Sequence, residues 1–115
     1  MKYLFCVYDD GSQTKRPSIG ERENFRDIFA EACLANEEAL RESGYLIATA
    51  VLQSAITVWI RDGKVFLSDD PFTRTNEQLT GLFIINARDL NEAIQVAAKM
   101  PQARRGPIEV RPLTK

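Results

Sequence analysis

The strand-like segments of this chain carry apolar side chains on both faces, and this pattern constrains the fold more than any other feature. Residues 82–85 read LFII, and residues 3–8 read YLFCVY, so neighbouring positions are apolar without alternation. An antiparallel sheet with one face in water normally alternates apolar and polar residues. The sequence therefore predicts a sheet that has both of its faces covered.

Two helices accompany six strand-like segments along the chain. The first helix begins near Ser18, with Glu21 in a capping-box position, and the second begins after Asp89, with Glu92 three residues on. The expected strands are residues 2–8, 45–52, 56–61, 64–68, 80–86 and 108–111. The Asp62-Gly63 pair between two of them is typical of a tight hairpin.

The order of these elements indicates the fold class. Removing the hairpin around Asp62-Gly63 as an insertion leaves β-α-β-β-α-β, which is the ferredoxin-like order. A length of 115 residues fits one domain over 1–115 and leaves no room for two. We therefore expect an α+β, ferredoxin-like domain with an extra hairpin.

Two helices can cover only one face of such a sheet. An uncovered apolar face would exceed the patch that soluble monomers usually expose. A second copy packed on that face about a two-fold axis would bury it. The sequence predicts a homodimer through the sheet face; the alternative is that loops and the extra hairpin cover the face within one chain.

Composition excludes several classes of function. Fifteen Lys and Arg residues against sixteen Asp and Glu residues give a net charge of -1, without the basic excess of nucleic-acid-binding proteins. No apolar run approaches the roughly 20 residues of a membrane-spanning helix, and residues 1–8 resemble a strand rather than an export signal. We therefore expect a cytoplasmic protein without nucleic-acid or membrane partners.

The chain contains no histidine and two cysteines. This composition excludes Ser-His-Asp and Cys-His catalysis and disfavours a zinc site, which needs four ligands. Cys6 and Cys33 occupy apolar positions of their elements, so reduced, buried thiols are expected. No cofactor is predicted, since the chain also lacks a glycine-rich phosphate loop.

Several short motifs occur in a characteristic order. The motifs are the opening Met1-Lys2-Tyr3, Arg61-Asp62-Gly63, the loop 69–72 (DDPF), 76–79 (NEQL), Gly81, 89–93 (DLNEA) and 109–112 (EVRP). In this order the chain resembles the YCII-related proteins, in particular the branch named for a DGPF motif. The resemblance runs over nearly the whole chain.

The resemblance implies a dimeric α+β barrel and much less about function. Relatives in the wider group include small enzymes thought to use a His-Asp pair on small cyclic substrates. This chain departs from that pattern in having no histidine, which puts catalysis in doubt. It also has Asp70 where the motif has glycine, which concerns only the shape of the loop.

Three charged residues are candidates for chemistry. Asp69 could act as a base at the rim of the sheet, or cap the following turn. Glu77 could form a carboxylate pair with Asp69, or be an exposed residue in the first turn of a helix. Arg111 could hold a substrate carboxylate with two hydrogen bonds, or form a salt bridge with Asp69 or Glu77.

The aromatic residues Tyr8, Tyr45 and Phe72 are the expected lining of a small-molecule pocket, although core packing is the more common fate of such side chains. Two functions remain open. The first is a cofactor-free enzyme for small organic acids or cyclic compounds, which would bind between helices and sheet with Asp69 as base and Arg111 as anchor. The second is a non-catalytic ligand-binding, accessory or regulatory module.

Overall fold

The computed structural model describes residues 1–9, 19–69 and 78–114, with the side chains of the first helix described from residue 28 onward. The elements are β1 (Lys2–Asp9), α1 (Ile19–Glu42), β2 (Leu46–Val51), β3 (Thr57–Arg61), β4 (Lys64–Ser68), β5 (Gln78–Asn86), α2 (Leu90–Ala98), η2 (Pro101–Arg104) and β6 (Ile108–Pro112). The expected order of helices and strands is confirmed. Four of the other strands differ from the expected ranges by one residue at one or both ends, β5 begins two residues early, and a short 3-10 helix occupies part of the expected loop after α2.

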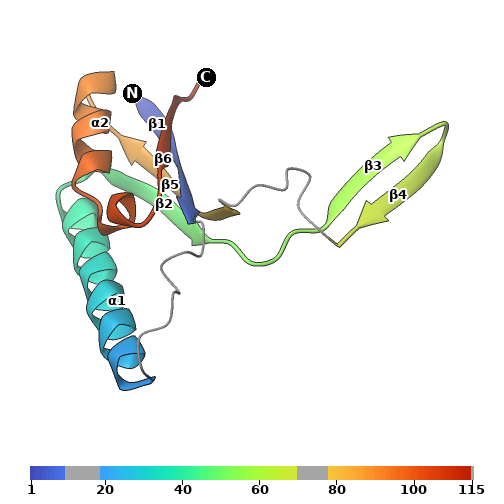
Figure 1. Ribbon diagram of the computed structural model, residues 1–115. Helices are drawn as coiled ribbons and strands as arrows, with labels where there is room; N and C mark the ends of the chain where they lie inside the picture. The colour runs from blue at the N-terminus through green and yellow to red at the C-terminus, as the bar shows by residue number, and fades with distance from the viewer. Residues whose placement is uncertain (10–18, 70–77, 115) are drawn as a thin grey trace.

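Four strands form one antiparallel sheet in the order β2-β5-β1-β6. With the β3–β4 hairpin set aside, this is the strand order of the ferredoxin-like fold, and the predicted fold class is confirmed. Both helices lie on one side of the sheet (Figure 1). The opposite side, which we call the open face, has no described helix on it.

The hydrophobic core lies between the sheet and the helices. Tyr3, Phe5 and Ile85 point from the central strands into this layer and are almost fully buried, together with Met100 after α2. Leu40 of α1 and the small residues of α2 close it from the other side. Each fully buried large side chain contributes about 1.5–3 kcal/mol, so this layer supplies most of the stability.

The β3–β4 hairpin forms a separate two-stranded sheet. Asp62 and Gly63 both have positive φ, 52° and 75°, as a two-residue hairpin turn of this type requires. The hairpin stands away from the sheet on the side opposite the helices (Figure 1). It does not lie over the open face, so the alternative in which the hairpin covers that face within one chain is not realised.

The projecting hairpin makes the molecule extended. The Cα radius of gyration is 16.6 Å, against about 13 Å for a compact domain of this length.

In the described part of the chain, no helix is long and apolar enough to cross a membrane.

Candidate functional site

A group of polar side chains lies on the open face where β1 pairs with β6. In this register Cys6 faces Glu109 and Leu4 faces Arg111. Side chains alternate along a strand, so these four residues lie on the face opposite the core, as does Tyr8. We call Tyr8, Glu109 and Arg111 the polar cluster.

Short distances connect the members of the cluster. The hydroxyl of Tyr8 donates a hydrogen bond to Oε1 of Glu109 over 2.6 Å, a length typical of a bond to an ionised carboxylate. Nη2 of Arg111 lies 3.4 Å from both carboxylate oxygens of Glu109. The second interaction is long, and the Arg111 side chain is 62% exposed. The guanidinium therefore remains accessible to a ligand.

Local backbone geometry positions Tyr8. The register between β1 and β5 shifts between Val7 and Tyr8, and such an irregularity redirects a side chain. The backbone N–H of Tyr8 donates to the carbonyl of Pro107 over 3.1 Å. Gly106 allows this close approach, because a Cβ at that position would overlap with the carbonyl oxygen of Tyr8.

The cluster shifts the pKa values of its own members. The hydrogen bond from Tyr8 lowers the pKa of Glu109; burial opposes this, and the charge of Arg111 adds to the lowering. The same hydrogen bond raises the pKa of Tyr8. The nearby carboxylate of Glu109 raises the pKa of Arg111. At neutral pH the cluster thus presents a neutral phenol, a carboxylate and a guanidinium.

Cys6 lies beside the cluster but is not activated by it. Burial raises the pKa of the Cys6 thiol, and the carboxylate of Glu109 raises it further, while Arg111 acts in the opposite direction. A nucleophilic cysteine needs a lowered pKa. Cys6 therefore contributes a small apolar surface to the open face.

Apolar side chains surround the cluster on the open face. Leu4 of β1 and Leu82 and Ile84 of β5 are half-buried there, next to Ala48 and Ala50 of β2 in the paired register. The result is an apolar platform with charged groups at its β6 edge. Such a surface can hold a ring on the platform and an acidic group at Arg111.

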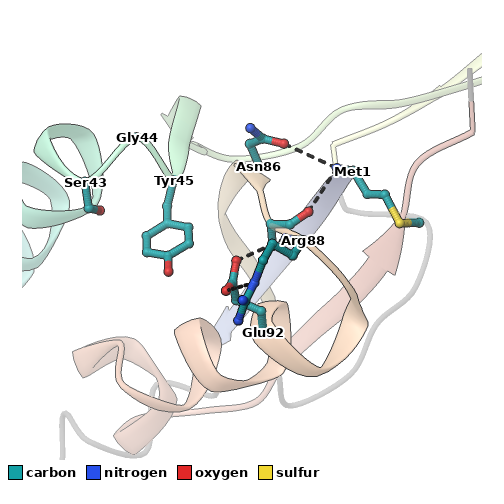
Figure 2. Close-up of a pocket in the computed structure, with 8 residues that line it drawn as sticks. Met1, Ser43, Gly44, Tyr45, Asn86, Arg88 and Glu92 are labelled. Atoms are coloured by element: carbon teal, nitrogen blue, oxygen red, sulfur yellow. Dashed lines mark hydrogen bonds and ion pairs between the residues drawn. The ribbon is translucent and has the colours of Figure 1, made fainter.

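A hollow with a volume of about 680 Å³ lies at the end of the sheet where β5 finishes and α2 begins. Figure 2 shows that its polar groups engage one another: Arg88 pairs with Glu92 at 2.8 Å, and the Met1 ammonium contacts Asn86 and Ala87. Glu92 also accepts from the backbone N–H of Arg88. These contacts pair the polar groups of the hollow with one another and stabilise the start of α2. We therefore assign the hollow a structural role.

The structure brings together two of the residues that sequence analysis selected. Tyr8 and Arg111 meet through Glu109, from strands that lie about a hundred positions apart in the chain. Tyr45 precedes β2 at the other end of the sheet, where it lines the hollow of Figure 2 and packs against the core. It is not part of the polar cluster.

The expected position of Arg111 between helices and sheet is wrong. Val110 takes the inward position and packs against the core, so strand alternation places Arg111 on the open face. There Arg111 forms an ion pair with Glu109 over 3.4 Å.

Asp69 follows β4 directly, at the base of the separate hairpin rather than at the rim of the four-stranded sheet. Phe72 and Glu77 lie outside the described residues. Gln78 already belongs to β5, which leaves no room for a helix that continues past Glu77. The roles given to these three residues stay predictions.

Sequence reasoning missed Glu109. A signal was present, since Glu109 and Arg111 are separated by one residue on a strand and so share a face. What the sequence could not supply was the pairing of β6 with β1.

Among the described residues, no group of three or more His, Cys, Asp or Glu side chains is arranged to hold a metal ion.

The fold is shared with a solved enzyme structure. The 5-chloro-2-hydroxyhydroquinone dehydrochlorinase TftG from Burkholderia phenoliruptrix AC1100, in complex with 2,5-dihydroxybenzoquinone, superposes with a TM-score of 0.53 at 16% sequence identity. The match covers 99% of this chain and 94% of that one. At this identity the likeness establishes the fold alone.

Sequence comparison identifies the family. An uncharacterised protein of Rhizobium meliloti (strain 1021) is 34% identical over 119 aligned positions, which cover 98% of this chain and 92% of that protein. The model of the YCII-related domain matches residues 1–115. The chain therefore belongs to the YCII-related domain family.

Proposed function

We propose that the protein is a homodimer that binds a small acidic organic compound on the open face of its sheet. The observation that carries this proposal is the polar cluster at the edge of an apolar platform, with the Tyr8–Glu109 hydrogen bond of 2.6 Å and an accessible Arg111. Few polar groups on a mostly apolar surface are characteristic of small-molecule sites.

Each side chain of the cluster has a role in this proposal. Arg111 holds a carboxylate or phenolate oxygen with charge-assisted hydrogen bonds. Glu109 accepts a hydrogen bond from a hydroxyl of the ligand, and Tyr8 fixes the orientation of that carboxylate. Leu4 and Leu82 contact the ring. The bound compound of the solved neighbour, 2,5-dihydroxybenzoquinone, is cyclic and acidic, and it supports this class of ligand.

The open face supports the proposed homodimer. Half-buried Leu4, Leu82 and Ile84 form an apolar surface that the described helices leave bare. Two copies packed face to face exclude water from this surface and enclose the cluster, so that the ring of the ligand would lie between the two copies. Exclusion of water strengthens every electrostatic contact to a bound anion.

A second candidate is a cofactor-free enzyme for small organic acids or cyclic compounds. The name of the solved neighbour, a dehydrochlorinase, favours it. In this chain Glu109 would accept the proton of a ligand hydroxyl, and Arg111 would hold the resulting anion. A carboxylate with a lowered pKa is a weak base at neutral pH, so the cluster supports binding better than proton abstraction.

Ligand binding is tested with 2,5-dihydroxybenzoquinone, benzoate and the neutral analogue benzamide in thermal-shift and calorimetric titrations. We expect the two acids to stabilise the wild type and benzamide to have little effect. Arg111→Gln should weaken the acids at least about tenfold, the effect of losing one charge-assisted hydrogen bond. The matched control is Arg104→Gln, an exposed arginine in η2 on the helix side.

Equal affinity of the wild type and Arg111→Gln for both acids would contradict the site. Following the ultraviolet spectrum of the bound compounds over time then separates the two candidates. A spectrum that changes with the wild type but not with Glu109→Gln identifies an enzyme, and a stable spectrum identifies a binding module.

The finer family assignment and the location are also proposals. We place the chain in the DGPF-motif branch because of the order of its motifs, with Asp69 at the start of the loop and Phe72 and Glu77 beyond the described part.

Cys6 and Cys33 are both free thiols. Free thiols fit the reducing cytoplasm, which is the location we propose.

A further inference from the structure

The hairpin formed by β3 and β4, which we call the arm, exposes a continuous aliphatic face. Val58 pairs with Leu67 and Ile60 pairs with Val65, so these four side chains lie on the same side of the arm. Their exposed fractions lie between 59% and 72%. Four large aliphatic residues in one surface, on two neighbouring strands, form a patch rather than scattered apolar positions.

On the opposite face of the arm, two aromatic side chains cover part of each other's surface. Trp59 stacks on Phe66 with ring centroids 5.6 Å apart, and these rings are 40% and 41% exposed. Arg61 and Lys64 share this face near the turn. The aliphatic face is therefore the one that lacks a cover.

A hairpin of this kind needs a cover to be stable. An isolated two-stranded hairpin is marginal in water, and stability normally requires a third strand or a packed surface. In the described part of the chain the arm forms its own sheet and pairs with no strand of the main sheet. Both of its strands are consequently edges with an apolar face in water, which is an arrangement that invites association.

We propose that the aliphatic face of the arm docks on a second copy of this chain. The inference rests on the homodimer proposed above and adds a second contact to it. The arm stands out on the side of the sheet opposite the helices (Figure 1). A copy packed on the open face therefore lies on the same side as the arm, and two-fold symmetry makes the contact reciprocal.

The area of the arm suits this role. Four aliphatic side chains about two-thirds exposed present on the order of 250 Å² of apolar surface. Two arms, each covering an equal area of the other copy, then bury about 1,000 Å² in total. Stable complexes bury roughly 1,200–2,000 Å², and the contact between the facing sheets brings the interface into that range. The two arms alone fall short of that range.

The test compares the dimer dissociation constants of three proteins by analytical ultracentrifugation and light scattering. Ile60→Ser/Val65→Ser removes the aliphatic contact, and Arg61→Ser/Lys64→Ser changes neighbouring positions on the other face as the matched control. We expect the first variant to weaken the dimer about 100-fold or more. The control should stay within about threefold of the wild type, within ordinary surface effects.

Trp59 is the single tryptophan of the chain and reports on the arm. Its ring stacks on Phe66 on the face of the arm opposite the aliphatic face, so quenching of its fluorescence by acrylamide reports whether the hairpin itself is intact. We expect equal quenching in the wild type and in Ile60→Ser/Val65→Ser, which shows that any loss of the dimer comes from the aliphatic contact. Circular dichroism verifies that the sheet and helices are retained in the variants.

The outcomes separate the arm from the dimer and from the ligand site. A wild-type dimer that Ile60→Ser/Val65→Ser leaves equally tight overturns the arm contact and keeps the homodimer. A wild type that is monomeric at tens of micromolar overturns both, and then a membrane or another protein becomes the candidate cover. Binding of acids through Arg111 is measured separately, so its failure would not be confused with either result.

Discussion

Tyr8 and Glu109 form the interaction that sets the charge distribution on the open face. The hydrogen bond between them raises the pKa of the phenol and lowers the pKa of the carboxylate. Both shifts favour the same pair of protonation states, a neutral tyrosine and an ionised glutamate. Single-residue changes at this pair should therefore have a characteristic dependence on pH.

We predict that Tyr8→Phe lowers the free energy of unfolding most between about pH 5 and pH 9. The lowered pKa of Glu109 gives stability that is present above the ordinary glutamate pKa of about 4.3 and is lost as the pH falls through the folded value. The raised pKa of Tyr8 gives stability that is present below about 10 and is lost as the pH rises through the folded value. Denaturant unfolding across this range measures the difference between the two proteins.

Tyr45→Phe is the matched control for this measurement, because the Tyr45 hydroxyl makes no hydrogen bond to a described carboxylate. Its effect on the free energy of unfolding is measured over the same pH range. If the effect of Tyr8→Phe is the same at all pH values, the proposed coupling between Tyr8 and Glu109 is wrong.

At the scale of elements, the start of α2 is fixed by two reciprocal contacts between side chains and backbone. The side chain of Asp89 accepts from the backbone N–H of Glu92 over 2.9 Å, and Glu92 reaches back to the backbone N–H of Arg88. The sequence pattern predicted the Asp89 cap with Glu92 three residues on. Together these contacts fix where β5 ends and where the helix that covers the core begins.

We predict that Asp89→Ala lowers the free energy of unfolding by about 1 kcal/mol, the usual effect of removing an N-cap. Asp89→Asn keeps an acceptor at the cap and should retain most of the stability. Thermal and denaturant unfolding of the two variants gives the comparison. Equal losses in both would show that the negative charge of Asp89, and not its hydrogen bond, stabilises the helix.

At the scale of the whole molecule, the sheet has one face in the core and one face open. The helix layer buries Tyr3, Phe5 and Ile85, whereas Leu82 and Ile84 of the same strands remain half-buried on the open side. In the proposed homodimer the open faces of two copies meet. A charge placed at the centre of that contact would be desolvated and would face its own copy across the axis.

Ile84→Lys should accordingly give a monomer under conditions where the wild type is dimeric, with about half its mass in light scattering. Leu90→Lys, on the exposed side of α2, is the control and should leave the mass unchanged. A dimer that tolerates Ile84→Lys would mean that the open face is not the interface.

Much of the fold could be predicted because it depends on interactions between residues close in the chain. Apolar patterning located the strands, the Asp89 and Glu92 pair located α2, and Asp62-Gly63 located a turn whose positive φ values the structure shows. The order of these elements then gave the ferredoxin-like topology. The same pattern indicated that one apolar face of the sheet would lack a cover.

The candidate site depended on contacts between distant parts of the chain. Tyr8 and Glu109 are 101 positions apart, and their hydrogen bond exists because β6 pairs with β1 in one particular register. A shift of one residue in that register would exchange the faces of Glu109 and Val110. Sequence reasoning could therefore select Tyr8 and Arg111 separately but not the carboxylate that joins them.

The sequence by itself thus determined the elements, their order and the two apolar faces, since each follows from local periodicity, capping and turn chemistry. The tertiary structure decided which face of the sheet the helices cover, that the β3–β4 hairpin leaves the sheet, and that Glu109 and Arg111 meet Tyr8 on the open side. The physical reason is that strand register and hairpin direction are fixed by packing summed over the whole molecule, and no short segment contains that information.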